Sequence, residues 1–399
     1  MAIPPTILVV HNFYQQPGGE DGVFEDETRL LESRGHKVIR FTAHNDAVKG
    51  RSQLKLARDT IWNNQTYREL NEIVRRERPA VAHFHNTFPL VSPAAYYAVR
   101  RAGAAVVQTL HNFRLLCPGA TFFRDNRICE DCLHKPVPIP AVLHSCYRDN
   151  RPATAILSTM LVTHRAMGTW NRQVDAYIAL TEFSRQKFID GGLPANRIIV
   201  KPNFVVEDPG IGDGSGGYAI FVGRLVPEKG IDTLLAAWEK LSAAGCTVKL
   251  KIVGDGPLAE NVRQAVARCP LIEWLGRKPA GEVLNLIGSA ACLIFPSTWY
   301  ETFGRVAVEA FAKGTPVIAS RLGAMAELID PGRTGLLFEP GNAADLATHV
   351  TCLTLNTPGW LRDSSRAEFV LKYTADINYE MLLEVYDKAM FVRGHVQTA

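Results

Sequence analysis

The stretch FPSTWYETFGRVAVE, residues 295–309, indicates the fold of this chain most directly. It begins where the apolar run 290–295 ends, and its pattern predicts the end of a buried strand, a short loop and an amphipathic helix. Gly314 is expected to end this helix, and a further strand is predicted over 316–319. A strand, a helix and a second strand in this order are typical of a parallel sheet in an α/β domain.

The start of this helix is suited to binding an anion. Phe303, Gly304 and Arg305 place backbone N–H groups at the positive end of the helix dipole, where a phosphate is favoured. Two carboxylates, Glu301 and Glu309, lie on either side of this start. A carboxylate beside a bound phosphate is electrostatically unfavourable, so the two acids need another role. Hydrogen bonding to sugar hydroxyls is the most direct one.

Short apolar runs alternate with helical patterns along the chain, which is the pattern of doubly wound parallel sheets. In the first half we expect strands over 6–10, 37–41, 80–84, 104–109, 176–180 and 198–201. In the second half we expect strands over 218–222, 248–253, 272–275, 290–295, 316–319 and 335–338. The predicted fold class is α/β, with two doubly wound Rossmann-like domains facing across a cleft.

A segment rich in Pro and Gly separates the two halves. The sixteen residues 202–217, PNFVVEDPGIGDGSGG, contain two Pro and five Gly, a composition typical of a linker. We therefore expect a first domain over 1–203, a linker over 204–217, a second domain over 218–376, and a terminal helix and tail over 377–399.

Length and composition indicate a globular protein. The 399 residues, 47% hydrophobic and 21% charged, are enough for two domains with full cores. No signal peptide is evident and no apolar run is long enough to span a membrane, so we expect a cytoplasmic protein. Residues 1–200 hold 25 Lys and Arg against 18 Asp and Glu, a difference of +7, whereas the rest of the chain holds 19 against 22, a difference of −3. The basic half either meets an anionic partner or membrane surface, or is a solvated face.

Two segments of the first half combine basic and apolar side chains. In 152–173 the apolar residues recur at helical spacing, and 49–67 adds further Lys, Arg and aromatic residues. Such helices either lie on a membrane surface, which for a cytoplasmic protein is the inner face, or pack into a core.

Four cysteines are clustered in a Pro-rich segment, 117–146. Cys129 and Cys132 form a CxxC pair, and eleven and thirteen intervening residues separate this pair from Cys117 and Cys146. Four thiols in such a segment suit a tetrahedral structural zinc site, although the outer spacings are looser than in a regular zinc ribbon. The alternative is four reduced, packed thiols, and disulfides are disfavoured in a cytoplasmic chain.

Several loops that follow predicted strands carry residues suited to a ligand site, because ligands of such sheets bind beyond the carboxyl ends of the strands. The first-half loops contain Gly18 and Gly19, which allow a ligand close to the backbone, and His111, which directly follows a strand. In the second half, GRLVPEKG presents Arg224 and Lys229, two cations that suit a diphosphate. Two further glycines, Gly254 and Gly256, lie in the sequence GDGP.

These motifs resemble those of the glycosyltransferase family 4 enzymes, which have the GT-B fold. The resemblance rests on GRLVPEKG and VGDGP, on two Glu residues eight positions apart, Glu301 and Glu309, on the sequence AFAKGTPVIAS that follows, and on GRTGLLFEPG. It implies a retaining transfer of a sugar from a nucleotide-diphosphate sugar to a glycan or lipid-linked saccharide acceptor bound by the first domain. It also implies that the terminal helix crosses back to the first domain.

The resemblance implies roles for individual residues. The positions match a diphosphate-binding pair (Arg224 and Lys229), a contact to the donor sugar (Glu301), a ligand of the ribose hydroxyls (Glu309), a glycine loop near the phosphates (Gly18 and Gly19) and a histidine near the reacting sugar (His111). The further donor-binding candidates are Gly254, Gly256, Phe303, Gly304 and Arg305.

No metal is expected to be needed for catalysis, because the chain lacks an Asp-x-Asp motif and two cations with a helix N-terminus can take its place. Alternative functions are a sugar-nucleotide epimerase, another enzyme of the same fold or a catalytically silent nucleotide-sugar-binding protein. A nucleic-acid-binding role is disfavoured by the net charge of only +4.

Overall fold

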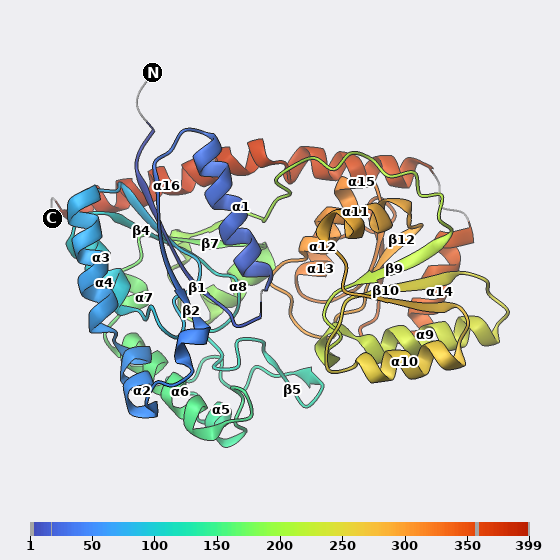
Figure 1. The fold of residues 1–399 in the computed structure, drawn as a ribbon, viewed down its shortest axis with the longest axis horizontal. Helices are drawn as coiled ribbons and strands as arrows, with labels where there is room; N and C mark the ends of the chain where they lie inside the picture. Colours follow the sequence, from blue (N-terminus) through green and yellow to red (C-terminus); the bar gives the residue numbers. More distant parts are fainter. Residues whose placement is uncertain (1–3, 17, 356–358, 398–399) are drawn as a thin grey trace. The chain divides into compact units, whose positions relative to one another are not determined.

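The computed structural model describes residues 4–16, 18–355 and 359–397. The chain divides into two compact units. Unit 1 comprises residues 1–122, 130–202 and 378–399, and unit 2 comprises 123–129 and 203–377. Each unit contains a sheet of six strands in which every pairing is parallel (Figure 1). This confirms the predicted class of two doubly wound α/β domains.

The sheet of unit 1 has the strand order β2-β1-β3-β4-β7-β8. Its strands are β1 (Ile7–Phe13), β2 (Val38–His44), β3 (Val81–Phe84), β4 (Ala105–Thr109), β7 (Ala176–Ala179) and β8 (Ile198–Val200). The helices of its chain are α1 (Gly19–Ser33), α2 (Gln53–Ile61), α3 (Asn64–Glu77), α4 (Ala94–Arg101), α5 (Ile139–Leu143), α6 (Arg151–Ala166), α7 (Thr169–Arg172) and α8 (Glu182–Asp190). The strand order reverses between β1 and β3, where a sheet of this type opens a ligand-binding crevice.

The sheet of unit 2 has the order β11-β10-β9-β12-β13-β14. Its strands are β9 (Tyr218–Val222), β10 (Lys249–Val253), β11 (Ile272–Gly276), β12 (Cys292–Phe295), β13 (Val317–Ser320) and β14 (Gly335–Phe338). Its helices are α9 (Ile231–Ala243), α10 (Ala259–Arg268), α11 (Ala280–Ser289), α12 (Arg305–Ala312), α13 (Ala324–Leu328), α14 (Ala343–Leu355) and α15 (Gly359–Lys372). The reversal point of this sheet lies between β9 and β12.

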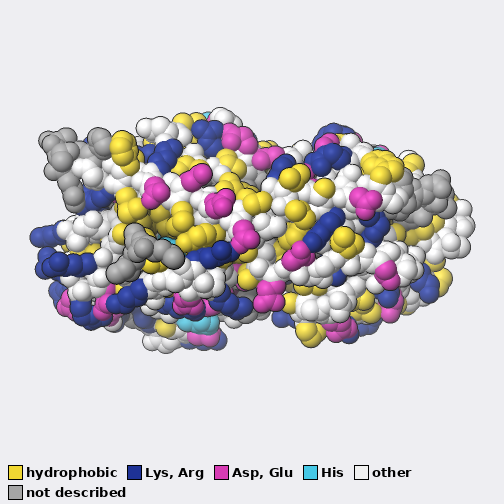
Figure 2. Space-filling model, turned by 90° about the horizontal axis from the view of Figure 1, so that it is seen from above, with side chains coloured by type: hydrophobic (Ala, Val, Ile, Leu, Met, Phe, Trp, Pro, Cys, Tyr) yellow, Lys and Arg dark blue, Asp and Glu magenta, His cyan; other side chains and the backbone are white. Residues whose placement is uncertain are grey.

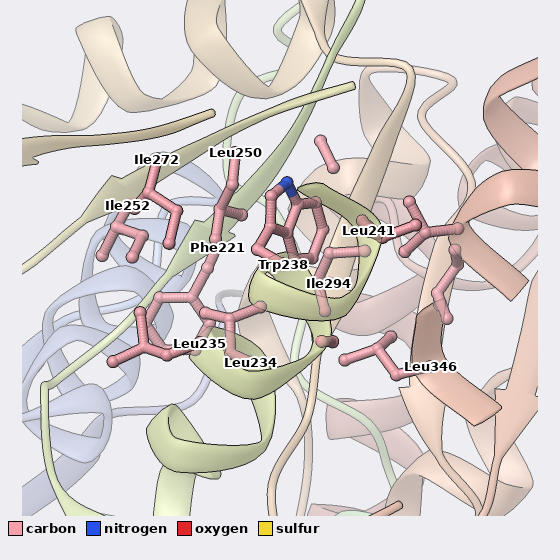
Figure 3. Close-up of a cluster of buried hydrophobic side chains, with 14 of the residues drawn as sticks. Phe221, Leu234, Leu235, Trp238, Leu241, Leu250, Ile252, Ile272, Ile294 and Leu346 are labelled. Atoms are coloured by element: carbon pink, nitrogen blue, oxygen red, sulfur yellow. The ribbon is translucent and has the colours of Figure 1, made fainter. Parts of the chain in front are cut away.

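The core of unit 2 explains how the sheet and its helices hold together. Trp238 of α9 is fully buried and donates a hydrogen bond from Nε1 to the carbonyl of Val248 at 3.0 Å. Figure 3 shows it packed among apolar side chains from the strands and from α9 and α14. Helices α9 and α14 pack together, and α12 packs against α15 (Figure 1).

All twelve predicted strands are present, and most of their ends lie within two residues of the predicted ones. The largest differences are at β1 and β2, which extend three residues further, to Phe13 and His44, because residues 7–13 pair with 38–44 throughout. His11 therefore lies within a strand, and the loop before α1 is shorter than the sequence indicated.

The predicted linker 204–217 belongs to unit 2 and is bonded to it, which corrects the expected boundary. The N–H groups of Gly212 and Gly214 donate to the carbonyls of Lys313 and Gly288 at 2.9 and 3.0 Å. From α15, the guanidinium of Arg362 donates to four carbonyls, those of Gly212, Gly288, Ala290 and Lys313. The glycines of this segment mark close backbone approaches, since a Cβ on Gly212 would lie 2.2 Å from the carbonyl oxygen of Gly288.

The two-residue strands β5 (Phe123–Arg124) and β6 (Arg127–Ile128) pair in the short segment of unit 2 that interrupts unit 1. The terminal helix α16 (Ala375–Gln397) begins in unit 2, and its residues from Asn378 onward belong to unit 1. The hydroxyl oxygen of Tyr386 on this helix lies 3.0 Å from Nδ1 of His83 in β3, so the helix returns to the first sheet as expected. Among the described helices, none combines the length and apolar character that spanning a membrane requires.

We predict that Arg362→Ala lowers the free energy of unfolding by at least about 2 kcal/mol, because several buried carbonyls lose their charged donor. Urea denaturation monitored by circular dichroism measures this change. The control is Arg263→Ala, which removes an exposed arginine paired with Glu260 and is expected to change stability by less than about 0.5 kcal/mol. Equal stability of both variants would contradict the role of Arg362.

Candidate active site

The loops that follow β9 and β12 meet at the reversal point of the second sheet. Thr298 donates a backbone hydrogen bond to the carbonyl of Glu228 at 2.9 Å. Gly230 has a φ of +72°, and a Cβ there would lie 1.8 Å from the carbonyl oxygen of Pro296. Only glycine combines this conformation with so close a neighbour. The two sequence motifs of unit 2, GRLVPEKG and FPSTWYETFGR, are therefore held against each other by their backbones.

Glu301 and Lys229 form a half-buried ion pair in this region. Lys229 Nζ lies 2.6 Å from Glu301 Oε1, and the same oxygen accepts hydrogen bonds from Ser297 Oγ at 2.8 Å and Trp299 Nε1 at 2.7 Å. The ammonium also lies 5.5 Å from the centres of the Phe295 and Trp299 rings, within cation–π range. Three donors on one oxygen fix the carboxylate, and the carboxylate in turn fixes the lysine.

Several other predicted donor-binding residues of unit 2 lie near Lys229 or Glu301 in the sequence. Arg224 is exposed and lies at the start of the loop that follows β9. Gly304 precedes the first residue of α12, and no side chain caps the helix there. Arg305, in the first turn, lies 3.8 Å from Glu309 through Nε and Oε1, and both side chains are partly exposed. Phe303 is buried, so it contributes packing and its backbone N–H.

Three of the predicted glycines have close neighbours inside the protein. A Cβ on Gly254 would lie 1.8 Å from the carbonyl oxygen of Gly223, and one on Gly256 would lie 2.6 Å from that of Leu225. A Cβ on Gly304 would lie 2.3 Å from the Met325 side chain. Gly254 and Gly256 are needed for packing between loops, Gly304 packs against a side chain of α13, and a contact of any of them with a nucleotide remains a prediction.

In unit 1, the β1–α1 loop leads into a hydrogen-bonded helix start. Gly18 precedes α1, and its N–H donates to Asp21 Oδ2 at 2.7 Å, while Asp21 Oδ1 lies 2.7 Å from Nε2 of the fully buried His11. A Cβ on Gly19 would have no neighbour within 4 Å. Gly18 and Gly19 are both exposed, so the backbone here is open to a ligand.

His111 lies at one end of a row of buried polar groups. Its Nε2 is 3.0 Å from His85 Nδ1, and the two rings are stacked with centres 5.2 Å apart. His85 Nε2 lies 3.3 Å from Glu27 Oε2, and Glu27 Oε1 lies 2.5 Å from Lys201 Nζ. Glu27, His85 and Lys201 are almost completely buried. These buried contacts therefore hold the ring of His111 in one orientation.

Burial decides the protonation of these histidines. It lowers the pKa of His83 to about 4, with Glu27 opposing and Lys201 reinforcing the shift. It also lowers the pKa of His85 well below the ordinary value, and the neighbouring histidines His83, His111 and His11 add to this effect. Both rings are therefore neutral at pH 7.

A small pocket of about 50 Å³ lies beside His111 at the carboxyl ends of β3 and β4. Its lining includes polar groups from both loops, among them Asn86, Thr87 and Arg114. Asn112 donates to Glu20 Oε1 at 3.3 Å, and burial raises the pKa of the Glu20 carboxyl.

Within the described residues, one group of three or more potential metal ligands converges, formed by Glu27, His83 and His85. The structure gives these groups other partners, because Lys201 holds Glu27 and the hydroxyls of Thr109 and Tyr386 lie within 3.0 Å of the two nitrogens of His83. A buried ammonium beside the carboxylate disfavours a cation there.

The four clustered cysteines are not part of that group, and none of them forms a disulfide. Cys117 and Cys146 both lie close to Gly119, since a Cβ built on this glycine would be within 3.7 Å of Cys117 Sγ and of Cys146 Cβ. Cys129 belongs to unit 2, and Cys132 belongs to unit 1. Structural zinc bound by Cys117, Cys129, Cys132 and Cys146 thus remains a prediction.

Comparison with known sequences identifies the family. Residues 17–208 match the sequence model of Glycosyltransferase Family 4, and residues 213–366 match that of Glycosyl transferases group 1. The two matches together cover both units and every predicted donor-binding residue. The chain belongs to glycosyltransferase family 4.

Curated relatives are glycosyltransferases of several kinds. The chain is 37% identical over 163 residues to an uncharacterized glycosyltransferase of Methanocaldococcus jannaschii, an alignment that spans 40% of this chain and 45% of that protein. It is 27% identical over 272 residues to the phosphatidyl-myo-inositol mannosyltransferase of Mycobacterium leprae, covering 66% of this chain and 70% of the relative.

Solved structures share the fold. The Anabaena protein HepE, solved in complex with UDP, superposes with a TM-score of 0.67 at 19% identity over 96% of this chain and 99% of that one. The sucrose-phosphate synthase of Thermosynechococcus elongatus gives a TM-score of 0.71 at 15% identity, over 96% and 98% of the two chains. At these identities the likeness supports the GT-B fold and no finer statement.

Sequence reasoning missed the groups that position the predicted residues. Ser297 and Trp299 lie inside the stretch 295–309, but only the structure shows that both donate to Glu301. Glu27 and Lys201 are 174 positions apart, and no local pattern could have paired them. The sequence offered one signal for such groups, namely that residues in a strand of the sheet and on the inner face of an amphipathic helix are expected to be buried.

We predict that the stability of the protein falls as the pH is lowered from about 6.5 towards 4. An unfolded histidine binds a proton below its ordinary pKa, while folded His83 does so only near pH 4, so the unfolded state binds more protons in this range. Its contribution is a loss of about 2 kcal/mol between pH 7 and pH 5. Urea unfolding at the two pH values measures the loss.

His83→Gln is expected to reduce this pH dependence, because glutamine does not titrate. The control is His144→Gln, which changes an exposed histidine and should keep the wild-type dependence. An unchanged pH dependence in His83→Gln would show that other groups cause the loss.

Proposed function

We propose that this protein is a retaining glycosyltransferase that moves a sugar from a nucleotide-diphosphate sugar to a glycan or lipid-linked saccharide. Unit 2 binds the donor and unit 1 binds the acceptor. The observation that carries the proposal is the ion pair of Lys229 and Glu301 at the reversal point of the second sheet, between two loops joined by their backbones. A charged pair held by additional hydrogen bonds in this position is suited to a ligand that is both anionic and rich in hydroxyl groups.

Two cations and the start of α12 provide the charge that the leaving diphosphate requires. Arg224 is exposed and available for a bidentate contact with phosphate oxygens. The ammonium of Lys229 is held in place before the donor arrives, so little reorganisation is needed when negative charge develops on the leaving group. The backbone N–H groups of Gly304 and Arg305 add the helix dipole.

We assign the two glutamates to different parts of the donor. Glu301 lies beside Lys229, next to the phosphates, so we assign it to the hydroxyls of the transferred sugar. Glu309 lies one helical turn inside α12 with a partly exposed carboxylate, and we assign it to the ribose hydroxyls. A nucleoside-diphosphate donor agrees with HepE, which was solved in complex with UDP and with UDP-glucose.

The acceptor is assigned to unit 1. Its β1–α1 loop exposes Gly18 and Gly19, and its pocket beside His111 is lined by polar side chains. The relative from Mycobacterium leprae is a phosphatidyl-myo-inositol mannosyltransferase, and the lipid in its name supports a lipid-linked acceptor here. Contact with the inner face of a membrane is part of the same proposal. The excess of Lys and Arg in residues 1–200 fits an anionic surface.

We predict that Arg224→Ala lowers turnover by roughly a hundredfold, the effect of losing one preorganised stabilising group. Because Arg224 is exposed, this variant is expected to fold normally. Lys229→Ala should have at least as large an effect, but it also removes a partner of the buried Glu301, so its folding is checked by circular dichroism. Glu309→Ala should mainly raise the KM for the donor.

Steady-state kinetics on a panel of nucleotide sugars measures these effects. Arg321→Ala is a matched control, since it removes a partly exposed arginine that follows the neighbouring strand β13 and lies 3.6 Å from Glu339. Wild-type kinetics in all three site variants would refute the proposed donor site.

We predict that transfer continues in excess EDTA, because protein cations take the place of a catalytic metal. The measurement is the initial rate with and without EDTA, followed by addition of magnesium. Complete loss of activity that magnesium restores would contradict the proposed stabilisation of the diphosphate.

A further inference from the structure

Unit 1 contains a second and larger pocket that the proposed reaction does not use. It has a volume of about 510 Å³, within the range of small-molecule sites. Its lining comes from Trp62 just after α2, from the start of α3, from α4, from Gln173 just after α7 and from the far end of α16. The lining residues are Trp62, Asn64, Tyr67, Tyr97, Arg100, Arg101, Gln173 and Arg393. All of them belong to unit 1, and none is a predicted donor-binding residue.

The pocket is cationic. Three of its lining residues are arginines, and no carboxylate is among the residues that line it. Arg100 is paired with the buried Asp175, which leaves the charges of Arg101 and Arg393 without a carboxylate in the lining. In Figure 2, Lys and Arg side chains gather at the left end, where α3 lies in Figure 1. An anion is therefore attracted to this part of unit 1.

Arg393 shows why a ligand is expected. Its Nη2 donates to the carbonyl of Arg100, while its Nε is buried without a hydrogen-bond partner. Burial and the neighbouring Arg100 lower the pKa of Arg393. The guanidinium groups of Arg100 and Arg393 repel each other, and an anion in the adjoining pocket would offset this repulsion.

The remaining lining groups suit a sugar ring. Trp62 lies 5.1 Å from Tyr97 and 6.2 Å from Tyr67 between ring centres, so the three aromatic rings form one cluster in the pocket wall. Aromatic faces pack well against the C–H groups of a pyranose ring. Asn64, Gln173 and the hydroxyl of Tyr67, which lies 3.5 Å from Arg101 Nη1, can exchange hydrogen bonds with sugar hydroxyls.

We propose that this pocket binds a phosphorylated saccharide. The phosphate contacts Arg101 and Arg393, and the ring packs on Trp62 and its aromatic neighbours. The same chemistry occurs in a soluble sugar phosphate and in a saccharide linked to a lipid through phosphate. The site is separate from the proposed donor site, so it stands whether or not the donor assignment holds.

The test is isothermal titration of the full chain with glucose 1-phosphate, with glucose and UMP as comparison ligands. We expect the sugar phosphate to bind and glucose to bind at least tenfold more weakly. Arg101→Ala, which changes an exposed side chain, should weaken binding at least about tenfold, and Trp62→Ala should do the same. Binding should also weaken as salt is raised.

Two controls separate this pocket from other sites. Arg68→Ala removes an exposed arginine from the same helix, α3, outside the pocket lining, and should leave the affinity within twofold. Lys229→Ala alters the donor site and should also leave it within twofold. If Lys229→Ala abolishes binding while Arg101→Ala does not, the ligand occupies the donor site and the proposal is wrong. Preference for UMP over glucose 1-phosphate would overturn the saccharide assignment.

A second arm identifies the source of the ligand. Phosphatidylcholine vesicles with and without prenyl-phosphate-linked glucose are sedimented with the wild type and with Arg101→Ala. Retention of the wild type alone by the glucose-bearing vesicles assigns the pocket to lipid-linked saccharides, and binding of the soluble probe alone assigns it to free sugar phosphates. The proposal fails if neither form binds, or if Arg101→Ala binds both as well as the wild type.

Discussion

The parallel direction of the strands is the constraint on which both units depend. Every strand of a six-stranded sheet ends at the same edge, so loops that are far apart in sequence meet there. In unit 2 this brings the loop after β9 against the loop after β12, and in unit 1 it places the loops after β1, β3 and β4 together. The ion pair of Lys229 and Glu301, and the contact of His85 with His111, both arise from this geometry.

Within each unit, a buried carboxylate holds groups that we propose to face the ligand. Glu301 accepts three hydrogen bonds on one oxygen and fixes Lys229. Glu27 lies between Lys201 and His85, and His85 contacts His111. Both arrangements bury charge, which is tolerated because each carboxylate has a cationic partner and further hydrogen bonds. The side chains presented to a ligand are thereby ordered before it binds.

Much of the fold was readable from the sequence because its signals are local. Twelve short apolar runs, each followed by a turn or helical pattern, predicted the strands, and glycines and charges at their ends marked the residues proposed to bind the donor. What could not be predicted depends on distant pairs. Arg362 and the four carbonyls it binds, or Glu27 and Lys201, are joined only once the chain has folded. The structure explains Gly254 and Gly256 by loop packing, and their predicted contact with the donor stays a prediction.

The bonded segment 204–217 also changes where the chain can be divided. Its Gly-rich composition suggests a flexible boundary at residue 217, yet its backbone is tied to α15 and to the loop after α12. Apart from the short segment 123–129, the chain enters unit 2 earlier, between Pro202 and Asn203, and returns to unit 1 between Ile377 and Asn378. A chimaera that exchanges donor units between family members would therefore keep its native contacts only if residues 203–217 travel with the second unit.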